Sequence, residues 1–254
     1  MTKHPQFIQL HQADNLALAA EAAAGLLAGD ASASPKFFYD ALGSRLFDVI
    51  TELPEYYPTR TEAAILAQHG PALAAAALAA TGSAPVLVDL GAGNCAKGAA
   101  LFGPVAPRRY VALDISVDYL RSALADLQRR HPAVDLVGVG QDFSQQLQLP
   151  DGLVDGPALV FYPGSSIGNF DPDAALRLLR QARALAGGGA LLIGVDQVKP
   201  VALRASRCIS MRDSAVLNSA TWRQSRGWKS LPSRRFRWVS RFRLNAAVTP
   251  RASS

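Results

Sequence analysis

The fold is decided by the segment Val86-Leu-Val-Asp-Leu-Gly91-Ala-Gly93-Asn-Cys-Ala-Lys97-Gly98. Its first five residues form a short apolar run, typical of a buried strand, which leads directly into a glycine turn. Glycine has no Cβ atom, so the backbone N–H groups of such a turn can approach a ligand closely. The segment therefore predicts either a nucleoside-binding turn or a tight connection between a strand and a helix.

Further short apolar runs follow this segment at helix-length intervals. Ser116 is a good N-cap for one intervening helix, and Asp171-Pro172 begins another helix that ends at Gly187. This alternation predicts an α/β fold over residues 85–196, a Rossmann-like parallel sheet with connecting helices on both faces. The five expected strands are Val86–Leu90, Tyr110–Leu113, Val134–Val139, Ala158–Tyr162 and Ala190–Val195.

The region before the first of these strands is expected to be helical. Residues 14–28 predict a surface helix, because Glu21 interrupts an apolar run that otherwise resembles a secretory signal. Residues 60–80 predict an Ala-rich helix, and no run reaches the ~18 uninterrupted apolar residues of a membrane span. Cys95 and Cys208 stand in unrelated contexts, which favours a reducing compartment. We therefore expect a cytoplasmic monomer with no membrane partner.

Charge is distributed unevenly along the 254 residues. Residues 201–254 hold eleven Arg and Lys229 against the lone acid Asp213, a net charge of +11, whereas residues 1–200 carry −5. We expect three parts: a helical region over 1–84, a ligand-binding sheet over 85–200, and a poorly ordered basic tail over 201–254. The four histidines are scattered singly and no zinc-ligand spacing occurs, so no metal site is expected.

Asp114 strengthens the nucleoside interpretation of the glycine turn. It ends the second expected strand, where a carboxylate can accept hydrogen bonds from a ribose diol. The third glycine of the pyrophosphate-binding pattern is replaced by Ala96, which favours a nucleoside without pyrophosphate, such as S-adenosylmethionine, over a dinucleotide. Asp142, just past the third strand, either meets the adenine ring or caps a turn.

Two other segments carry polar or aromatic groups suited to a small substrate. Residues 161–170, Phe-Tyr-Pro-Gly-Ser-Ser-Ile-Gly-Asn-Phe, follow the fourth strand, where ligands of open parallel sheets bind. The loop offers neutral hydrogen bonds without a nucleophile–base pair, or else is an ordinary turn capped by Asn169. Residues 38–60 are dense in aromatic residues and prolines, and Glu55-Tyr56-Tyr57-Pro58 suggests the wall of a binding site.

These motifs together resemble one family. Leu53-Pro-Glu-Tyr-Tyr-Pro-Thr-Arg60, Phe38-Tyr-Asp, Gly91-x-Gly93 with Lys97, Asp142-Phe143 and Gly164-Ser-Ser-Ile-Gly-Asn169 occur in the order of the histidine-specific S-adenosylmethionine-dependent methyltransferases of ergothioneine biosynthesis. The resemblance implies a class I methyltransferase fold with an N-terminal helical substrate-binding segment, and methylation of the α-amine of L-histidine to hercynine. It implies cofactor contacts from Gly91, Gly93, Lys97, Asp114, Asp142 and Phe143, and histidine contacts from Tyr56 and Asn169, with Tyr39 and Phe47 lining the same site.

The sequence departs from the family pattern at two places. Asn94-Cys95 stands where the family has small hydroxyl residues, which predicts modestly weaker cofactor binding. Beyond Pro200, Arg/Ser/Trp-rich sequence replaces the region that, in the family, completes the substrate site with an acidic residue and a serine. A reading-frame change in a GC-rich gene would produce this abrupt change in composition and charge. Two alternatives follow: a cofactor-binding protein without activity, or an RNA-directed methyltransferase that uses the basic tail.

Overall fold

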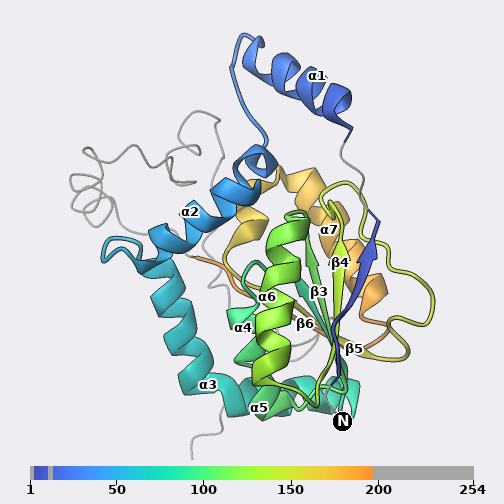
Figure 1. Ribbon diagram of the computed structural model, residues 1–254. Coiled ribbons are helices and arrows are strands. Elements are labelled where there is room, and N and C mark those ends of the chain that lie inside the picture. Colours follow the sequence, from blue (N-terminus) through green and yellow to red (C-terminus); the bar gives the residue numbers. More distant parts are fainter. Residues whose placement is uncertain (1–2, 11–13, 197–254) are drawn as a thin grey trace, which may run out of the picture.

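A single parallel sheet organises the chain. The computed structural model describes residues 3–10 and 14–196, and within them six strands lie in the order β1-β4-β3-β2-β5-β6 (Figure 1). All five strand pairs are parallel, and in the centre Val88 of β2 stands beside Val111 of β3 and Val160 of β5. The strands are β1 Gln6–Gln9, β2 Val86–Leu90, β3 Arg109–Asp114, β4 Asp135–Gly140, β5 Ala158–Tyr162 and β6 Ala190–Ile193.

The predicted Rossmann-like α/β fold is confirmed, with corrections at its borders. Strand β1 lies in the region that we expected to be purely helical, and it pairs with β4 at one edge of the sheet. The last strand ends at Ile193, two residues earlier than expected. Residues 141–157, between β4 and β5, contain no helix, although we expected a helix in each connection. The division of the chain into three parts stays a prediction, and the basic tail lies outside the described residues.

Helices join the strands and extend beyond them. Asp14 begins the first helix by accepting N–H bonds from Leu16 and Ala17, and Asp171 begins the last by accepting one from Ala174. Both caps agree with the sequence pattern, in which a short acidic side chain satisfies the first free N–H groups of a helix. The helices are α1 Asn15–Leu26, α2 Ala41–Glu52, α3 Tyr57–Thr81, α4 Ala96–Ala99, α5 Phe102–Val105, α6 Val117–Arg130 and α7 Pro172–Leu185, with short 3₁₀ helices η1 Pro35–Phe38 and η2 Ser166–Asn169.

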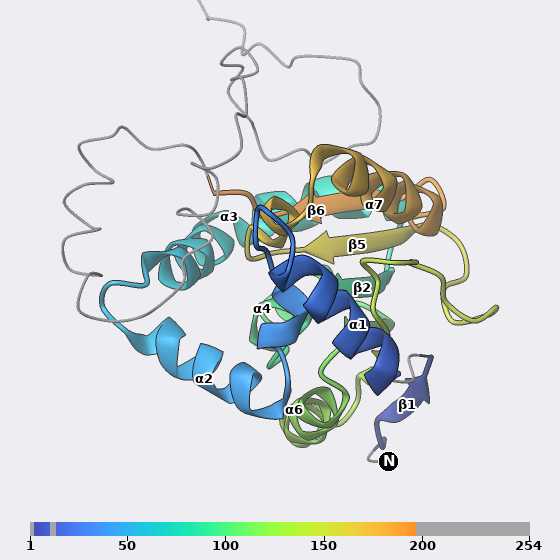
Figure 2. The same ribbon diagram turned by 90° about the horizontal axis from the view of Figure 1, so that it is seen from above.

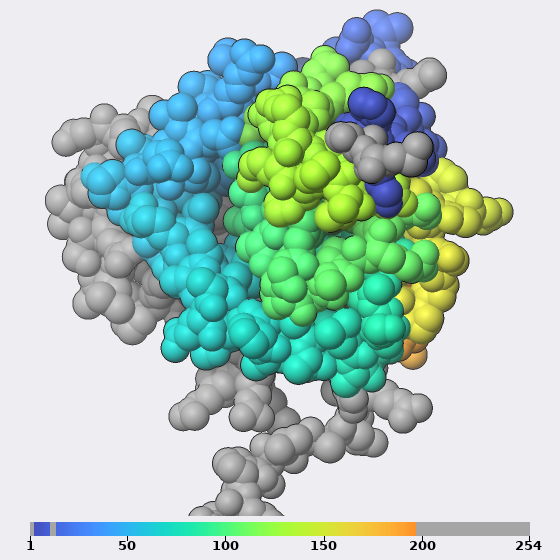
Figure 3. Space-filling view, turned by 60° about the horizontal axis from the view of Figure 1, so that its bottom comes forward, coloured from blue at the N-terminus to red at the C-terminus, as the bar shows by residue number. Residues whose placement is uncertain are grey.

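Each face of the sheet buries its own apolar core. On one face α3, α5 and α6 cover strand residues such as Leu87 and Leu136, and these helices form one continuous outer surface (Figure 3). On the other face α7 and the loop over residues 141–157 cover Val88 and Val160. Successive strand residues point to opposite faces, so a strand covered on both sides is apolar almost throughout. This explains why the central strands read as short continuous apolar runs.

The N-terminal helices lie at one end of the sheet. Helix α1 has no buried residue and lies beyond the carboxyl ends of the strands, away from the sheet layers (Figures 1 and 2). Helix α2 spans the region between α3 and α6 at the same end of the molecule. The surface helix predicted over residues 14–28 is thereby confirmed, and α2 is placed where it can cover a ligand site.

Helix α3 is long and apolar enough to cross a membrane by length and composition, with a mean hydropathy of 1.4 over its most apolar 18-residue window. That single helix is weak evidence for a membrane span, because helices of soluble cores satisfy the same criterion. Its buried residues, Leu66, Gly70, Ala74 and Ala77, lie on the side of α5 and the sheet. In this fold α3 therefore serves as a covering helix.

Asp89 is a carboxylate enclosed in the centre of the sheet. It belongs to β2, is only 1% exposed, and accepts a hydrogen bond from the Tyr110 hydroxyl at 2.7 Å. Its other oxygen, Oδ1, has no hydrogen-bond partner among the described residues. Burial raises the pKa of Asp89 to about 7, although the Tyr110 hydrogen bond and Lys97 act in the opposite direction. The group therefore titrates close to neutral pH.

Candidate cofactor and substrate site

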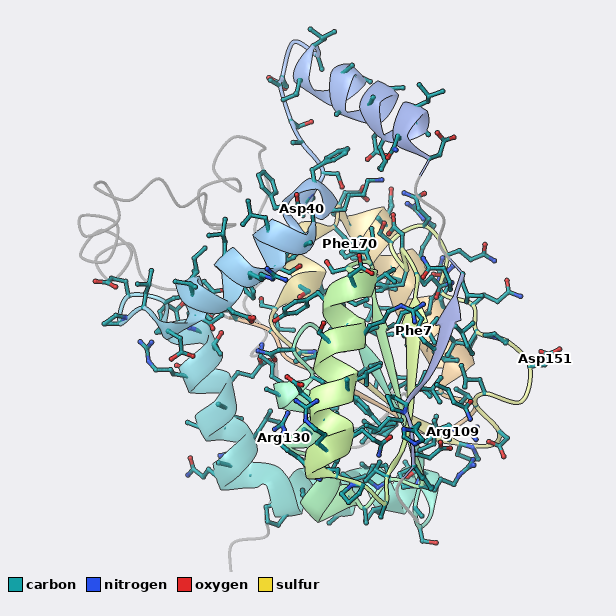
Figure 4. The ribbon with its side chains drawn as sticks, in the orientation of Figure 1. Phe7, Asp40, Arg109, Arg130, Asp151 and Phe170 are labelled. Atoms are coloured by element: carbon teal, nitrogen blue, oxygen red, sulfur yellow. The ribbon has the colours of Figure 1, made fainter. Side chains whose placement is uncertain are left out.

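The candidate site lies at the edge of the sheet where the parallel strands end. The glycine turn follows β2, Asp114 ends β3, Asp142 follows β4, and the Gly164–Asn169 loop follows β5. Asp40, which caps α2, and Phe170 lie at this end of the molecule, whereas Arg109, at the start of β3, lies at the opposite end (Figure 4). Carboxyl ends of parallel strands are the usual ligand edge of such sheets.

The glycine turn has the backbone conformation that the sequence predicts. Gly91 and Gly93 have φ angles of 71° and 53°, and Cys95 is also left-handed at 60°. The Gly91 N–H donates to the Leu113 carbonyl at 2.9 Å, which holds the turn against β3. A Cβ atom at Gly93 would meet nothing within 4 Å, so this part of the turn borders open space. The turn is therefore a surface at which a ligand can approach backbone atoms.

Asp114 is fastened to the glycine turn and keeps capacity for a ligand. Its Oδ2 accepts the Gly93 N–H at 2.9 Å and its Oδ1 accepts the Ser116 N–H at 2.9 Å. Burial raises the pKa of Asp114, while these backbone hydrogen bonds act to lower it. Each carboxylate oxygen has a second lone pair, so the two oxygens can still accept two hydroxyl protons. That capacity matches a ribose diol.

Phe143 packs against the glycine turn, whereas Asp142 makes its hydrogen bond elsewhere. The Phe143 ring lies against Gly91, with its Cζ 3.6 Å from the position of a Cβ there, and contacts Tyr162 edge to face at 6.0 Å. Asp142 Oδ1 instead accepts the Ser144 N–H at 3.0 Å, and Oδ2 lies 3.8 Å from the Lys36 ammonium. Asp142 thus caps a turn, the alternative considered from the sequence, and its role toward a cofactor stays a prediction.

Lys97 reaches the site but is engaged by a residue that the sequence reasoning missed. Its Nζ lies 2.6 Å from Glu62 Oε2, on α3. The same carboxylate accepts the Gly164 N–H, at 2.8 Å by Oε1 and 3.1 Å by Oε2. Glu62 lies two residues after Arg60, the last residue of the Pro-Glu-Tyr-Tyr-Pro-Thr-Arg string, and no local signal in the sequence points to its partners Lys97 and Gly164.

Three aromatic residues predicted for the substrate come together. The ring of Phe47 contacts Tyr39 at 6.0 Å and Tyr56 at 5.8 Å between centroids, both edge to face. Burial is the main reason that the pKa of Tyr56 rises to about 12, with Tyr39 and Glu62 adding to it. The Tyr56 phenol is therefore protonated at neutral pH and is a neutral hydrogen-bonding group.

Asn169 approaches from a different element. It ends η2, in the loop after β5, and is half-buried. Within residues 3–10 and 14–196, no hydrogen bond joins its amide to the aromatic group or to another side chain. An unsatisfied, half-buried amide can both donate to and accept from a ligand.

Two polar side chains of α2, Asp48 and Ser44, connect this helix to the cofactor side of the site. Asp48 of α2 accepts a hydrogen bond from Tyr119 and another from Asn94 Nδ2 at 3.2 Å, next to Gly93. The Ser44 and Ser116 hydroxyls are 2.9 Å apart, and Ser116 donates to the Tyr39 carbonyl. Ser116 occupies the N-cap position of α6, as we expected, but its side chain makes no capping hydrogen bond, because its hydroxyl serves this long-range contact.

No group of three or more His, Cys, Asp or Glu side chains is placed to hold a metal ion in the described part of the chain. Cys95 is buried and free, while Cys208 lies outside that part. The site thus consists of an open glycine turn, the Asp114 carboxylate, the ion pair of Lys97 and Glu62, three aromatic rings and the neutral amide of Asn169. This donor set fits a nucleoside with an attached amino acid beside a small aromatic substrate.

Several proteins of known name are similar to this chain in sequence. The histidine N-alpha-methyltransferase of Mycolicibacterium smegmatis is 41% identical over 189 residues, which cover 72% of this chain and 56% of that protein. The histidine N-alpha-methyltransferase of Mycobacterium tuberculosis is 39% identical over 199 residues, 75% of this chain and 59% of that protein. Ergothioneine biosynthesis protein 1 of Neurospora crassa is 33% identical over 165 residues, 62% of this chain and 18% of that protein.

The chain thus spans a little over half the length of the two bacterial relatives. A family profile described as "Histidine-specific methyltransferase, SAM-dependent" matches residues 18–205, which include most of α1, every later element up to β6 and every residue of the candidate site. The chain belongs to the family of histidine-specific, S-adenosylmethionine-dependent methyltransferases.

Proposed function

We propose that this chain transfers a methyl group from S-adenosylmethionine to the α-amine of L-histidine, which leads to hercynine. The observation that carries the proposal is the hydrogen-bonded link between Tyr39, one of the three aromatic residues, and the segment that holds Asp114. Ser116, whose N–H binds Asp114, donates its hydroxyl to the Tyr39 carbonyl. A substrate held by Tyr39, Phe47 and Tyr56 therefore lies next to the glycine turn and Asp114.

The proposed cofactor contacts divide by the chemistry of each group. Asp114 accepts the ribose hydroxyls, Phe143 packs beside the base, and the turn at Gly91 and Gly93 admits the ligand to backbone atoms. Lys97 offers an ammonium group to the carboxylate of the methionine part, and Asp142 lies near the adenine. When bound, the cofactor supplies a methyl group on a positively charged sulfur.

The residues of the chain act mainly by orientation. Methyl transfer requires the nitrogen lone pair to be in line with the bond that breaks, and such positioning can supply ~7–11 kcal/mol of the barrier. Tyr56 and Asn169 are both neutral, so they can orient a neutral amine without adding a competing positive charge. We assign no single catalytic base.

The sequence leaves a second function open. A protein that binds the cofactor without methylating histidine is the corresponding alternative. RNA methylation depends on residues 201–254, which lie outside the described part of the chain.

Isothermal calorimetry with S-adenosylhomocysteine and histidine, separately and together, tests the proposal when it is joined to mass spectrometry of the products. We expect S-adenosylhomocysteine to bind and to increase histidine affinity, and we expect mono-, di- and trimethylated histidine from the chain with S-adenosylmethionine. Nucleoside binding without histidine binding or product would support the cofactor-binding alternative. If the chain binds neither S-adenosylhomocysteine nor histidine, both functions are contradicted.

The Tyr56→Phe variant tests the substrate assignment. Loss of one hydroxyl hydrogen bond is worth about 0.5–1.5 kcal/mol, so we expect kcat/KM for histidine to fall by roughly 2- to 12-fold. The matched control is Tyr57→Phe, because the Tyr57 hydroxyl donates to Asp196 at 2.7 Å. Affinity for S-adenosylhomocysteine should be unchanged in both variants. An equal loss of histidine turnover in both would remove the specific role of Tyr56.

A further inference from the structure

Glu62 is a charged residue placed in the second turn of an apolar helix, facing the candidate site. Its side chain is 11% exposed and that of Lys97 is 29% exposed, so their ion pair is shielded from much of the solvent. Shielded pairs are screened less by salt than surface pairs, and a buried carboxylate requires partners for its oxygens. We therefore expect the negative charge of Glu62 to serve a specific role at this site.

The carboxylate of Glu62 joins three segments at the carboxyl edge of the sheet. It binds Lys97, on the short helix after the glycine turn, and the N–H of Gly164, in the loop after β5. It also lies against the end of β6, since a Cβ atom at Gly194 would come within 2.0 Å of Glu62 Oε1. A side chain at that position would require the Glu62 carboxylate to move, so Gly194 leaves room for the carboxylate where it stands.

We propose that Glu62 is a positioning residue, which holds the Lys97 ammonium in place for the carboxylate of the cofactor's methionine part. This inference rests on the proposed function. The lysine side chain is long and flexible, so ordering it costs rotamer entropy. An ion pair already present in the free protein removes part of that cost from the binding step. The ammonium has three donors, so one can bind Glu62 while others bind the ligand.

The same carboxylate links the cofactor side to the substrate loop. Gly164, whose N–H it accepts, has a φ of 80° and begins the segment that ends at Asn169. The position of a Gly164 Cβ would be 3.3 Å from Lys97 Nζ, so the loop and the ammonium are in close contact. Glu62 thus fixes the ammonium and the start of the Asn169 loop in one arrangement.

Glu62→Gln separates these two contacts. The glutamine keeps an oxygen for the Gly164 N–H but has no charge for Lys97. The measurement compares S-adenosylhomocysteine with 5′-methylthioadenosine, which shares its nucleoside part but has no amino acid group. We expect Glu62→Gln to weaken S-adenosylhomocysteine by about 5- to 20-fold, and 5′-methylthioadenosine by less than twofold. Glu52→Gln, an exposed glutamate at the end of α2, is the matched control and should change neither affinity.

A double-mutant cycle then assigns the effect to Lys97. If Glu62 acts through Lys97, the double variant Glu62→Gln/Lys97→Ala should bind S-adenosylhomocysteine no more weakly than Lys97→Ala alone. An equal loss for both nucleosides, or independent losses in the cycle, would show a purely structural role and overturn the proposal. Tighter binding by Glu62→Gln would overturn it as well. If the unaltered chain binds neither nucleoside, the proposed function itself fails, and this inference fails with it.

Discussion

Asp114→Ala is expected to weaken S-adenosylhomocysteine binding by roughly 10- to 150-fold, which corresponds to about 1.5–3 kcal/mol for lost hydrogen bonds to a charged group. The reason is specific to this geometry. Each oxygen of Asp114 already accepts one backbone N–H, and the remaining lone pair of each is available to a ribose hydroxyl. Calorimetry or a fluorescence titration at constant salt measures the change.

Comparing adenosine with 2′,3′-dideoxyadenosine shows whether the diol is the group concerned. The unaltered chain should prefer adenosine, and Asp114→Ala should lose that preference. Asp118→Ala removes an exposed carboxylate from the first turn of α6 and controls for the general change of charge. If Asp114→Ala still discriminates between the two nucleosides, Asp114 does not bind the ribose.

Asp89→Asn is expected to remove a pH dependence of stability worth about 4 kcal/mol. The pKa of Asp89 is raised from 3.8 to about 7, mainly by burial, and each pKa unit corresponds to 1.36 kcal/mol. Below pH 4 the carboxyl is protonated in both folded and unfolded chains. Between pH 4 and 7 it ionises only in the unfolded chain, so the folded state loses stability as the pH rises, and above pH 7 the loss is constant.

The measurement is urea unfolding of both proteins at pH 4 and pH 8. The stability of Asp89→Asn relative to the unaltered chain should increase by about 4 kcal/mol between the two pH values. Constant effects of the amide, including its own unpaired N–H group, cancel in this double difference. Asp151→Asn, at an exposed loop position, should show almost no change. A double difference below about 1 kcal/mol would mean that the Asp89 carboxylate is solvated in the folded protein.

The sequence predicted the parts of the fold that depend on local pattern. The central strands, the surface helix over residues 14–28 and the Asp171 cap follow from apolar runs and from residues adjacent in sequence. Strand β1 was missed because it has four residues, of which only Phe7 and Ile8 are apolar, and its partner lies far along the chain. A short edge strand has no periodic signal of its own.

The candidate site was predicted to a similar extent. The glycine turn and Asp114 were recognised from residue type and spacing, whereas Tyr39 and Phe47 were assigned from the family resemblance, and the roles of all of them toward a ligand stay predictions. Glu62 and Asp48 could not be assigned in this way, because each acts through a long-range contact with the glycine-turn region: Glu62 with Lys97, and Asp48 with Asn94. Such partners are set by how α2 and α3 pack beside the sheet, which local sequence does not specify.

The position of β1 has a consequence for protein synthesis. Gln6 pairs with Val137 and Gln9 with Gly140, so β1 leaves the ribosome 131 residues before its partner is made. At 5–20 residues per second, this delay is roughly 7–26 s. During that time β2 and β3, which are adjacent in both sequence and sheet, can already pair. Strand β1 must therefore wait for β4, and the sheet grows outward from its middle to reach it.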